Sequence, residues 1–206
     1  MYLKEHLMFI AIEGIDTSGK STQINLLKQT FPNALFTKEP GGTPLGQALR
    51  EKILDHKLSS HAQFLLFLAD RSLHIEEVIK PNSHRLIFSD RSLISGLAYA
   101  PCLLQEAIDL HKIHGLLEVI PDLVFVLKLD HTELKKRLDK KTSMDCIEAQ
   151  GVAFLEHTQK RLLEACQILK LKTYILDASK SPSSIHQSIL EKLESLLGSF
   201  KHNKLA

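Results

Sequence analysis

The sequence predicts an α/β protein whose largely parallel sheet is covered by helices on both faces. Short apolar runs of strand length alternate with longer segments that carry apolar residues at helical spacing. Strands that alternate with helices in this way are joined by crossover connections and run parallel. Glycine-rich or acidic segments also follow several of the apolar runs, and the carboxyl ends of parallel strands are where such folds bind ligands.

The individual elements follow from these patterns and from the residues that interrupt them. Strands are expected at residues 8–12, 34–37, 85–90, 123–129 and 173–176. Helices are expected at residues 22–28, 45–54, 61–79, 93–100, 104–118, 133–138, 147–169 and 184–197. Pro32 and Pro81 are expected to end two helices, because proline has no backbone N–H. Asp130 and Thr132 are candidate caps of helix 133–138.

Length and composition favour one domain over residues 1–206, large enough to bury a core. A net charge of +2 is too small to indicate a nucleic-acid or membrane surface. Three cysteines without C-x-x-C spacing argue against a disulfide framework and favour a cytoplasmic location. No apolar run reaches the roughly 18 residues of a membrane span. Residues 1–7 lack a signal-peptide core and are interpreted as an optional leader.

The most informative stretch, Gly-Ile-Asp-Thr-Ser-Gly-Lys-Ser at residues 14–21, fits G-x-x-x-x-G-K-[ST] between an expected strand and an expected helix. Glycines let successive N–H groups point at phosphate oxygens, and the helix adds the positive end of its dipole. Lys20 is expected to reach the β- and γ-phosphates of ATP, and Ser21 to hold Mg²⁺. A plain glycine turn would not require Lys-Ser after the second glycine. The expected ATP-binding residues here are Gly14, Ile15, Asp16, Thr17, Ser18, Gly19, Lys20, Ser21 and Thr22.

Two acids near this loop are candidates for specific roles. Asp90 ends an apolar strand, where a carboxylate for Mg²⁺ is expected, although it could also cap the next helix. Arg91 follows it and offers a guanidinium fork for phosphate oxygens. Asp16 would be repelled by a polyphosphate, so it either faces a sugar hydroxyl of a second substrate or is merely exposed.

Arginines elsewhere suggest that the second substrate carries a phosphate. Arg50, Arg71 and Arg91 each follow a segment expected to line the site. Phe67 precedes Arg71 by one helical turn and could stack on a base, although taken alone it is better interpreted as core. The polar segment after Arg137 is either a closing lid or a solvated loop. The closest histidine pair, His111 and His114, is interpreted as solvated surface rather than a metal site.

Several separated motifs together resemble the thymidylate kinase family, over nearly the whole chain from Phe9 to about Ile189. The most specific of them are Glu39-Pro40-Gly41-Gly42-Thr43 and Ser89-Asp90-Arg91-Ser92, in this order after the phosphate loop. The others are Glu13-Gly14-Ile15-Asp16, Leu65-Leu66-Phe67-Leu68-Ala69-Asp70-Arg71, Ser95-Gly96, Pro121-Asp122-Leu123 and Asp177-Ala178-Ser179. The resemblance implies a P-loop NTPase-type sheet, like that of nucleoside monophosphate kinases, with a short lid at about residues 139–147.

The resemblance also implies residue roles. Asp16 would hold the 3′-hydroxyl of dTMP, Phe67 would stack on thymine, and Arg71 would read the base edge. Arg50 and Arg91 would clamp the acceptor phosphate. Other implied contacts are Glu39 near this phosphate and the Mg²⁺ shell, Tyr99 against a ribose 2′-hydroxyl, Pro40 and Ser95 at the substrate, and Arg137 and Ala178 at adenine. A homodimer is implied as well.

One departure from the family pattern concerns the lid. Thr17 leaves the phosphate loop without a basic residue before Lys20, and family members of this kind use lid arginines. Here the lid carries Lys140 and Lys141, and Cys146 stands where an arginine is common. Lysine is a point charge rather than a fork. Lys141 is therefore expected to replace the lid arginine in part.

The expected reaction is in-line transfer of the ATP γ-phosphoryl group to dTMP, giving dTDP and ADP. Two alternatives remain at this point. Another nucleotide or nucleoside kinase could share the loop and the Asp90–Arg91 pair. A nucleotide-dependent switch would need a guanine-reading Asn-Lys-x-Asp tetrad, which the sequence does not contain.

Overall fold

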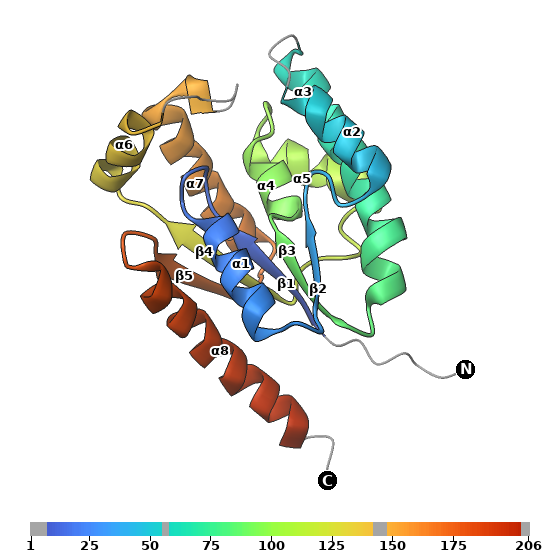
Figure 1. The fold of residues 1–206 in the computed structure, drawn as a ribbon. Helices are drawn as coiled ribbons and strands as arrows, with labels where there is room; N and C mark the ends of the chain where they lie inside the picture. Colours follow the sequence, from blue (N-terminus) through green and yellow to red (C-terminus); the bar gives the residue numbers. More distant parts are fainter. Residues whose placement is uncertain (1–7, 55–57, 142–147, 203–206) are drawn as a thin grey trace.

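A computed structural model describes residues 8–54, 58–141 and 148–202 (Figure 1). Its sheet consists of β1 (Met8–Glu13), β2 (Leu35–Lys38), β3 (Leu86–Asp90), β4 (Leu123–Lys128) and β5 (Thr173–Asp177). The strands are ordered β2-β3-β1-β4-β5, and every pair is parallel. The predicted α/β fold class and all five predicted strands are confirmed.

Burial of the strands explains why they are nearly continuous apolar runs. All six residues of the central strand β1 are buried, and so are the first five of β4. The edge strands β2 and β5 are only partly buried. A parallel sheet covered on both faces requires this pattern. Phe88 of β3 stacks on Phe36 of β2 at 5.2 Å between ring centroids, which ties the β2 edge to the core.

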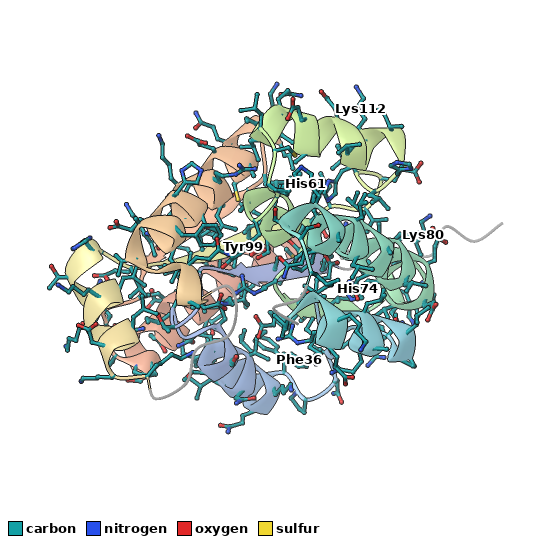
Figure 2. The ribbon with its side chains drawn as sticks, turned by 90° about the horizontal axis from the view of Figure 1, so that it is seen from above. Phe36, His61, His74, Lys80, Tyr99 and Lys112 are labelled. Atoms are coloured by element: carbon teal, nitrogen blue, oxygen red, sulfur yellow. The ribbon has the colours of Figure 1, made fainter. Side chains whose placement is uncertain are left out.

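Helices cover both faces of the sheet. Their bounds are α1 (Lys20–Thr30), α2 (Pro44–Ile53), α3 (Ser60–His74), α4 (Leu93–Ala98), α5 (Leu104–Ile113), α6 (His131–Asp139), α7 (Val152–Ile168) and α8 (Pro182–His202). α1 and α8 pack together on one face, and α4 and α7 pack together on the other (Figures 1 and 2). α2 and α3 pack against each other on the β2 side of the sheet.

Caps fix several helix starts. The Asp130 carboxylate accepts from Glu133 N at 2.8 Å, so Asp130 rather than Thr132 is the cap of α6. The Thr43 hydroxyl accepts from Gly46 N at 2.9 Å and starts α2 directly after the Glu-Pro-Gly-Gly loop. This cap fixes the position of the loop relative to the helix that carries Arg50.

Several predicted helix ends are wrong. α5 ends at Ile113 rather than 118, and α7 begins at Val152 rather than 147, after a short 3₁₀ turn (Glu148–Gln150). Two glycines with positive φ, Gly115 (+69°) and Gly151 (+87°), set these boundaries. Predicted helix 61–79 also changes character after His74: a π-helical turn covers Ile75–Ile79 and a 3₁₀ turn covers Lys80–Asn82.

Some predictions concern residues outside the described ranges. These are the leader 1–7, most of the lid, and Cys146 within it. Within the described ranges, no helix combines the length and the apolar character needed to cross a membrane.

Candidate active site

Two adjoining pockets open at the carboxyl edge of the sheet. The inner pocket brings together all nine residues that the sequence analysis assigned to the acceptor. These are Asp16, Glu39, Pro40, Arg50, Phe67, Arg71, Arg91, Ser95 and Tyr99. The loop pocket is formed by the phosphate loop together with β3, the β2 end and the lid lysine. Its lining includes Thr17, Gly19, Lys20, Ser21, Thr22, Asp90 and Lys141.

Four residues line both pockets: Asp16, Glu39, Arg50 and Arg91. We call these four the junction. Two are acids and two are arginines, contributed by the phosphate loop, the end of β2, α2 and the turn after β3. A molecule in one pocket and a molecule in the other would therefore meet beside two guanidinium groups.

The phosphate loop has the conformation that its sequence predicts. A Cβ on Gly14 would lie 2.8 Å from Leu127 O, so a larger residue cannot fit between the loop and β4. Thr17 has a φ of +67°, a conformation that is uncommon for a non-glycine residue. Gly19 forms the N-cap of α1, with a φ of +98°. The loop thereby brings the N-terminus of α1 to the loop pocket.

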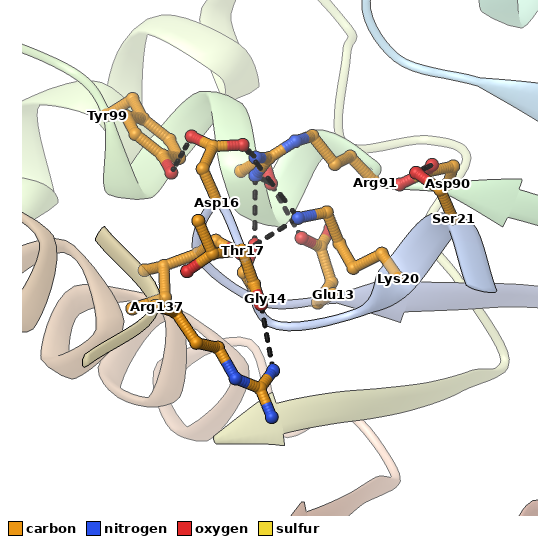
Figure 3. Close-up of polar contacts among 12 residues, drawn as sticks. Glu13, Gly14, Asp16, Thr17, Lys20, Ser21, Asp90, Arg91, Tyr99 and Arg137 are labelled. Carbon is orange, nitrogen blue, oxygen red and sulfur yellow. Dashed lines mark hydrogen bonds and ion pairs between the residues drawn. The ribbon is translucent and has the colours of Figure 1, made fainter. Parts of the chain in front are cut away.

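Lys20 is buried beneath the loop that it belongs to. Its ammonium Nζ donates to Ile15 O at 2.9 Å and lies 4.0 Å from Asp16 Oδ1 (Figure 3). Burial and the nearby charge of Arg91 lower the pKa of Lys20 to about 8. A polyphosphate in the loop pocket would favour the charged ammonium.

Arg91 joins the turn after β3 to the phosphate loop. Its guanidinium donates from Nη1 to Gly14 O at 3.0 Å and to Ser95 Oγ at 3.0 Å, and from Nη2 to Asp16 Oδ1 at 2.5 Å (Figure 3). It also lies over the ring of Tyr99, 5.3 Å from its centroid. Arg91 is therefore fixed at the junction by two segments, the phosphate loop and α4 with its C-cap.

Asp16 is held between Arg91 and Tyr99, so it is not merely exposed. Tyr99 Oη donates to Asp16 Oδ2 at 3.3 Å. Burial would raise the pKa of Asp16, but the charges of Arg91 and Lys20 outweigh burial and lower it to about 2. The carboxylate is thus ionised and able to accept hydrogen bonds at the junction.

Glu13 is a supporting residue to which the sequence analysis gave no role. This fully buried carboxylate accepts from Ser92 N at 2.7 Å, Ser92 Oγ at 2.8 Å and Ser95 Oγ at 2.6 Å. Burial raises the pKa of Glu13. Since Ser95 in turn accepts from Arg91, Glu13 orients the whole turn after β3. A charged residue at the end of an otherwise apolar strand was the signal that could have indicated it.

Glu39 is held in a second buried network. Glu39 Oε1 accepts from Arg71 Nη1 and His74 Nδ1, each at 2.5 Å, and Arg71 Nη2 donates to Val119 O. Burial would raise the pKa of Glu39, but Arg71 and His74 together hold it below its usual value. Arg71 Nε is buried without a hydrogen-bond partner among the described residues.

Ser21 and Asp90 supply oxygen donors side by side. Ser21 Oγ donates to Asp90 Oδ2 at 3.4 Å, and Asp90 Oδ1 is buried without a hydrogen-bond partner in the described part of the chain. Ser92, not Asp90, caps α4, so the alternative role of Asp90 as a helix cap is wrong. A hydroxyl and a carboxylate oxygen are donors that suit Mg²⁺.

Arg137 connects α6 to the phosphate loop and to the segment after β5. It donates from Nη1 to Thr17 O at 2.9 Å and from Nη2 to Ala178 O at 2.7 Å. Glu133 Oε1 accepts from Arg137 Nε at 2.8 Å, a third contact that fixes the guanidinium. Lys141, in the residues after α6, also lines the loop pocket.

Two aromatic side chains differ from their expected surroundings. Phe67 is only half-buried and lines the inner pocket, so it is not a core residue. His111 is 2% exposed, and its Nδ1 lies 2.8 Å from Ala107 O, so its assignment to the solvated surface was wrong. Burial lowers the pKa of His111. His114 is exposed, as expected.

A parallel sheet with a phosphate loop, joined to an arginine-bearing second pocket, defines a P-loop phosphotransferase that acts on a phosphorylated acceptor. The family model described as thymidylate kinase matches residues 12–189. The thymidylate kinase of Wolinella succinogenes is 49% identical over 89% of this chain and 96% of its own, and that of Sulfurimonas denitrificans is 46% identical over 90% and 99%. The chain belongs to the thymidylate kinase family.

A solved structure shows the same fold. The crystal structure of thymidylate kinase from Ehrlichia chaffeensis superimposes with a TM-score of 0.72 at 24% identity, over 91% of this chain and 98% of the other.

Proposed function

We propose that the inner pocket binds dTMP, that the loop pocket binds the phosphates of ATP, and that the junction aligns the two phosphates that react. As a family member, the chain is an ATP-dependent dTMP kinase: it transfers the γ-phosphoryl group of ATP to dTMP, giving dTDP and ADP for dTTP synthesis.

The observation that carries the assignment is the pair of pockets with a shared wall. A transfer between two phosphates accounts for two arginines, Arg50 and Arg91, that line both pockets. A phosphate oxygen of the acceptor is already anionic near neutral pH, so the reaction needs alignment and charge stabilisation rather than a strong general base.

In the inner pocket, Phe67 is assigned to stacking on thymine and Arg71 to the base edge. The buried, unpartnered Nε of Arg71 supports this role, because its other nitrogens are already used by Glu39 and Val119. Tyr99 is hydrogen-bonded to Asp16, and both are assigned to the sugar: Asp16 would accept from the 3′-hydroxyl, and Tyr99 would leave no room for a 2′-hydroxyl. Pro40 and Ser95 complete the wall.

In the loop pocket, Lys20 is assigned to the β- and γ-phosphates. Arg137, which donates to Thr17 of this pocket, is assigned to the adenine ring. Arg137 already contacts Ala178, whose backbone is assigned to the adenine edge. Ser21 and Asp90 are assigned to Mg²⁺, directly or through its waters, since their oxygens fit this ion and Asp90 Oδ1 has no described partner. Bound there, Mg²⁺ would offset charge on the phosphates.

Binding experiments test the two-pocket assignment. Phe67→Ala is expected to weaken dTMP binding by about 10- to 100-fold, since a stacked base is worth about 1–3 kcal/mol, and to leave binding of an imido analogue of ATP unchanged. Lys20→Ala is expected to weaken binding of the ATP analogue and to leave dTMP binding unchanged. Isothermal titration calorimetry measures both, with Ile168→Ala, a half-exposed residue at the end of α7, as the control. Equal effects of either variant on both ligands would contradict separate pockets.

Lys141 is proposed to replace, in part, the lid arginine of related enzymes. It lines the loop pocket, whereas its neighbour Lys140 does not. Lys141→Ala is expected to lower kcat by about 10-fold, corresponding to roughly 1.4 kcal/mol of lost charge stabilisation in the transition state. Lys140→Ala is the matched control. If kcat of the Lys141 variant equals that of the control, the lid lysine has no such role.

We also propose a single catalytic domain, a homodimer and a cytoplasmic location. Leu45 on α2 and Leu65 on α3, helices that pack together, are both exposed and would offer apolar contacts to a second copy. Light scattering at the mass of one chain would contradict the dimer. Cys102 and Cys166 are free thiols, as expected in a reducing compartment.

A further inference from the structure

His74, the last residue of α3, lies between two residues of the β2 end. Its ring is fully buried, with Nε2 2.7 Å from Thr37 Oγ1 and Nδ1 2.5 Å from Glu39 Oε1. Thr37, His74 and Glu39 therefore form a hydrogen-bonded chain, which we call the positioning chain. It runs from the edge strand to an acid of the junction.

The Glu-Pro-Gly-Gly loop is shaped around this ring. A Cβ on Gly42 would come within 2.5 Å of His74 Cδ2, so only glycine fits against the imidazole. The neighbouring Gly41 N donates to Asp70 Oδ1 at 2.9 Å, which attaches the same loop to the same turn of α3. The last turn of α3 is thus the surface on which the loop rests, and His74 is its central contact.

The partners of the His74 ring determine which of its nitrogens carries a proton. Arg71 and His74 hold the pKa of Glu39 below its usual value, so its carboxylate accepts and His74 Nδ1–H donates. The Thr37 hydroxyl can donate to Nε2 of a neutral ring or accept from the N–H of a charged one. Thr37 therefore holds the ring in either state with Nδ1–H directed at Glu39.

This arrangement has a consequence for the reaction. His74 and Arg71 both act on Oε1 of Glu39, and no hydrogen bond among the described residues uses Oε2. The second oxygen is thereby available to the two pockets that Glu39 lines. We propose that His74 is a positioning residue: it fixes the orientation of the Glu39 carboxylate at the junction, where a misplaced negative charge would repel the reacting phosphates. This proposal rests on the proposed function of the junction.

Two substitutions of His74 distinguish the roles of its two ring nitrogens. Asparagine places an amide N–H near the position of Nδ1, whereas glutamine places one near Nε2. His74→Asn is expected to keep kcat with dTMP within about 3-fold of the original enzyme, since the donor to Glu39 remains. His74→Gln is expected to lower kcat by about 10- to 100-fold, the usual effect of losing a hydrogen bond to a charged group. The KM for ATP is expected to change little in either variant.

Controls distinguish positioning from a purely structural role. His61→Gln, at the exposed start of the same helix, is expected to match the original enzyme (Figure 2). Melting temperatures of the two His74 variants are measured in parallel. Equal losses of kcat in both, or a larger loss in the asparagine variant, would overturn the proposal. If neither variant folds, Thr37→Val is expected to lower kcat several-fold and Thr37→Ser to restore it, and no loss in Thr37→Val would overturn the proposal.

A double variant tests whether His74 acts through Glu39. If it does, adding His74→Gln to Glu39→Gln lowers kcat no further than Glu39→Gln alone. Additive losses would overturn the proposal. Failure of the proposed function is distinguishable, because the original enzyme would then not phosphorylate dTMP, whereas failure of the positioning role leaves that activity intact.

Discussion

Replacing Arg91 with alanine is expected to lower kcat for dTMP phosphorylation by about 10³-fold or more, the effect usually found when an arginine that stabilises phosphoryl-transfer charge is removed. The guanidinium contacts Gly14, Asp16 and Ser95 from a single position at the junction. Its loss removes the guanidinium that we propose to face both reacting phosphates. It also frees Asp16, whose low pKa depends on this neighbour.

Arg91→Lys tests whether the positive charge of Arg91 is sufficient or whether its planar guanidinium is also needed. Lysine keeps the positive charge but cannot contact three acceptors as a planar fork, so its kcat is expected to lie between the alanine variant and the original enzyme. Arg85→Ala, half-buried and directly before the opposite end of β3, is the control. Steady-state kinetics with ATP and dTMP measure all three. An alanine variant within 10-fold of the original enzyme would contradict the assignment of Arg91 to the reacting phosphates.

Removal of Mg²⁺ is expected to have the other large effect. Chelation with EDTA should lower the rate by at least about 10³-fold, since a bound divalent ion contributes several kcal/mol of charge stabilisation, and added Mg²⁺ should restore it. Asp90→Asn is expected to raise the Mg²⁺ concentration for half-maximal rate by about 10-fold or more. The Asp90 carboxylate is next to Ser21 and has an oxygen with no partner among the described residues.

Asp109→Asn, an exposed acid on α5, is the matched control for Asp90. Its Mg²⁺ dependence should equal that of the original enzyme. If the Asp90 variant follows the same Mg²⁺ curve as the control, the ion is held elsewhere and the assignment of Ser21 and Asp90 is wrong.

The fold and the phosphate loop could be predicted because their signals are local. Alternation of apolar runs with helical periodicity is sufficient for a parallel α/β sheet, and the loop pattern lies within residues 14–21. Helix ends were less predictable. The sequence around Gly115 and Gly151 continues the helical pattern, and only the positive φ of each glycine in the folded chain ends or delays the helix.

The supporting residues of the site could not be predicted, because their partners are distant in sequence. Glu13 binds Ser92, 79 residues further on, and His74 binds Glu39, 35 residues earlier. The spacing of these residues in the sequence does not indicate that they pair. His111 was misassigned for a related reason: its position on a helix does not show that its ring packs beside Phe64 of α3 and borders the inner pocket.

The measurement that tests the central claim most directly is a coupled ADP-release assay with ATP, Mg²⁺ and a panel of acceptors: dTMP, dUMP, dGMP, dCMP and thymidine. The two-pocket account predicts turnover that strongly favours dTMP, with thymidine inactive because it lacks the phosphate that Arg50 and Arg91 would clamp. Turnover of thymidine in place of dTMP would contradict the proposal that two phosphates meet at the junction. The assignment of the phosphate loop to ATP would not be affected.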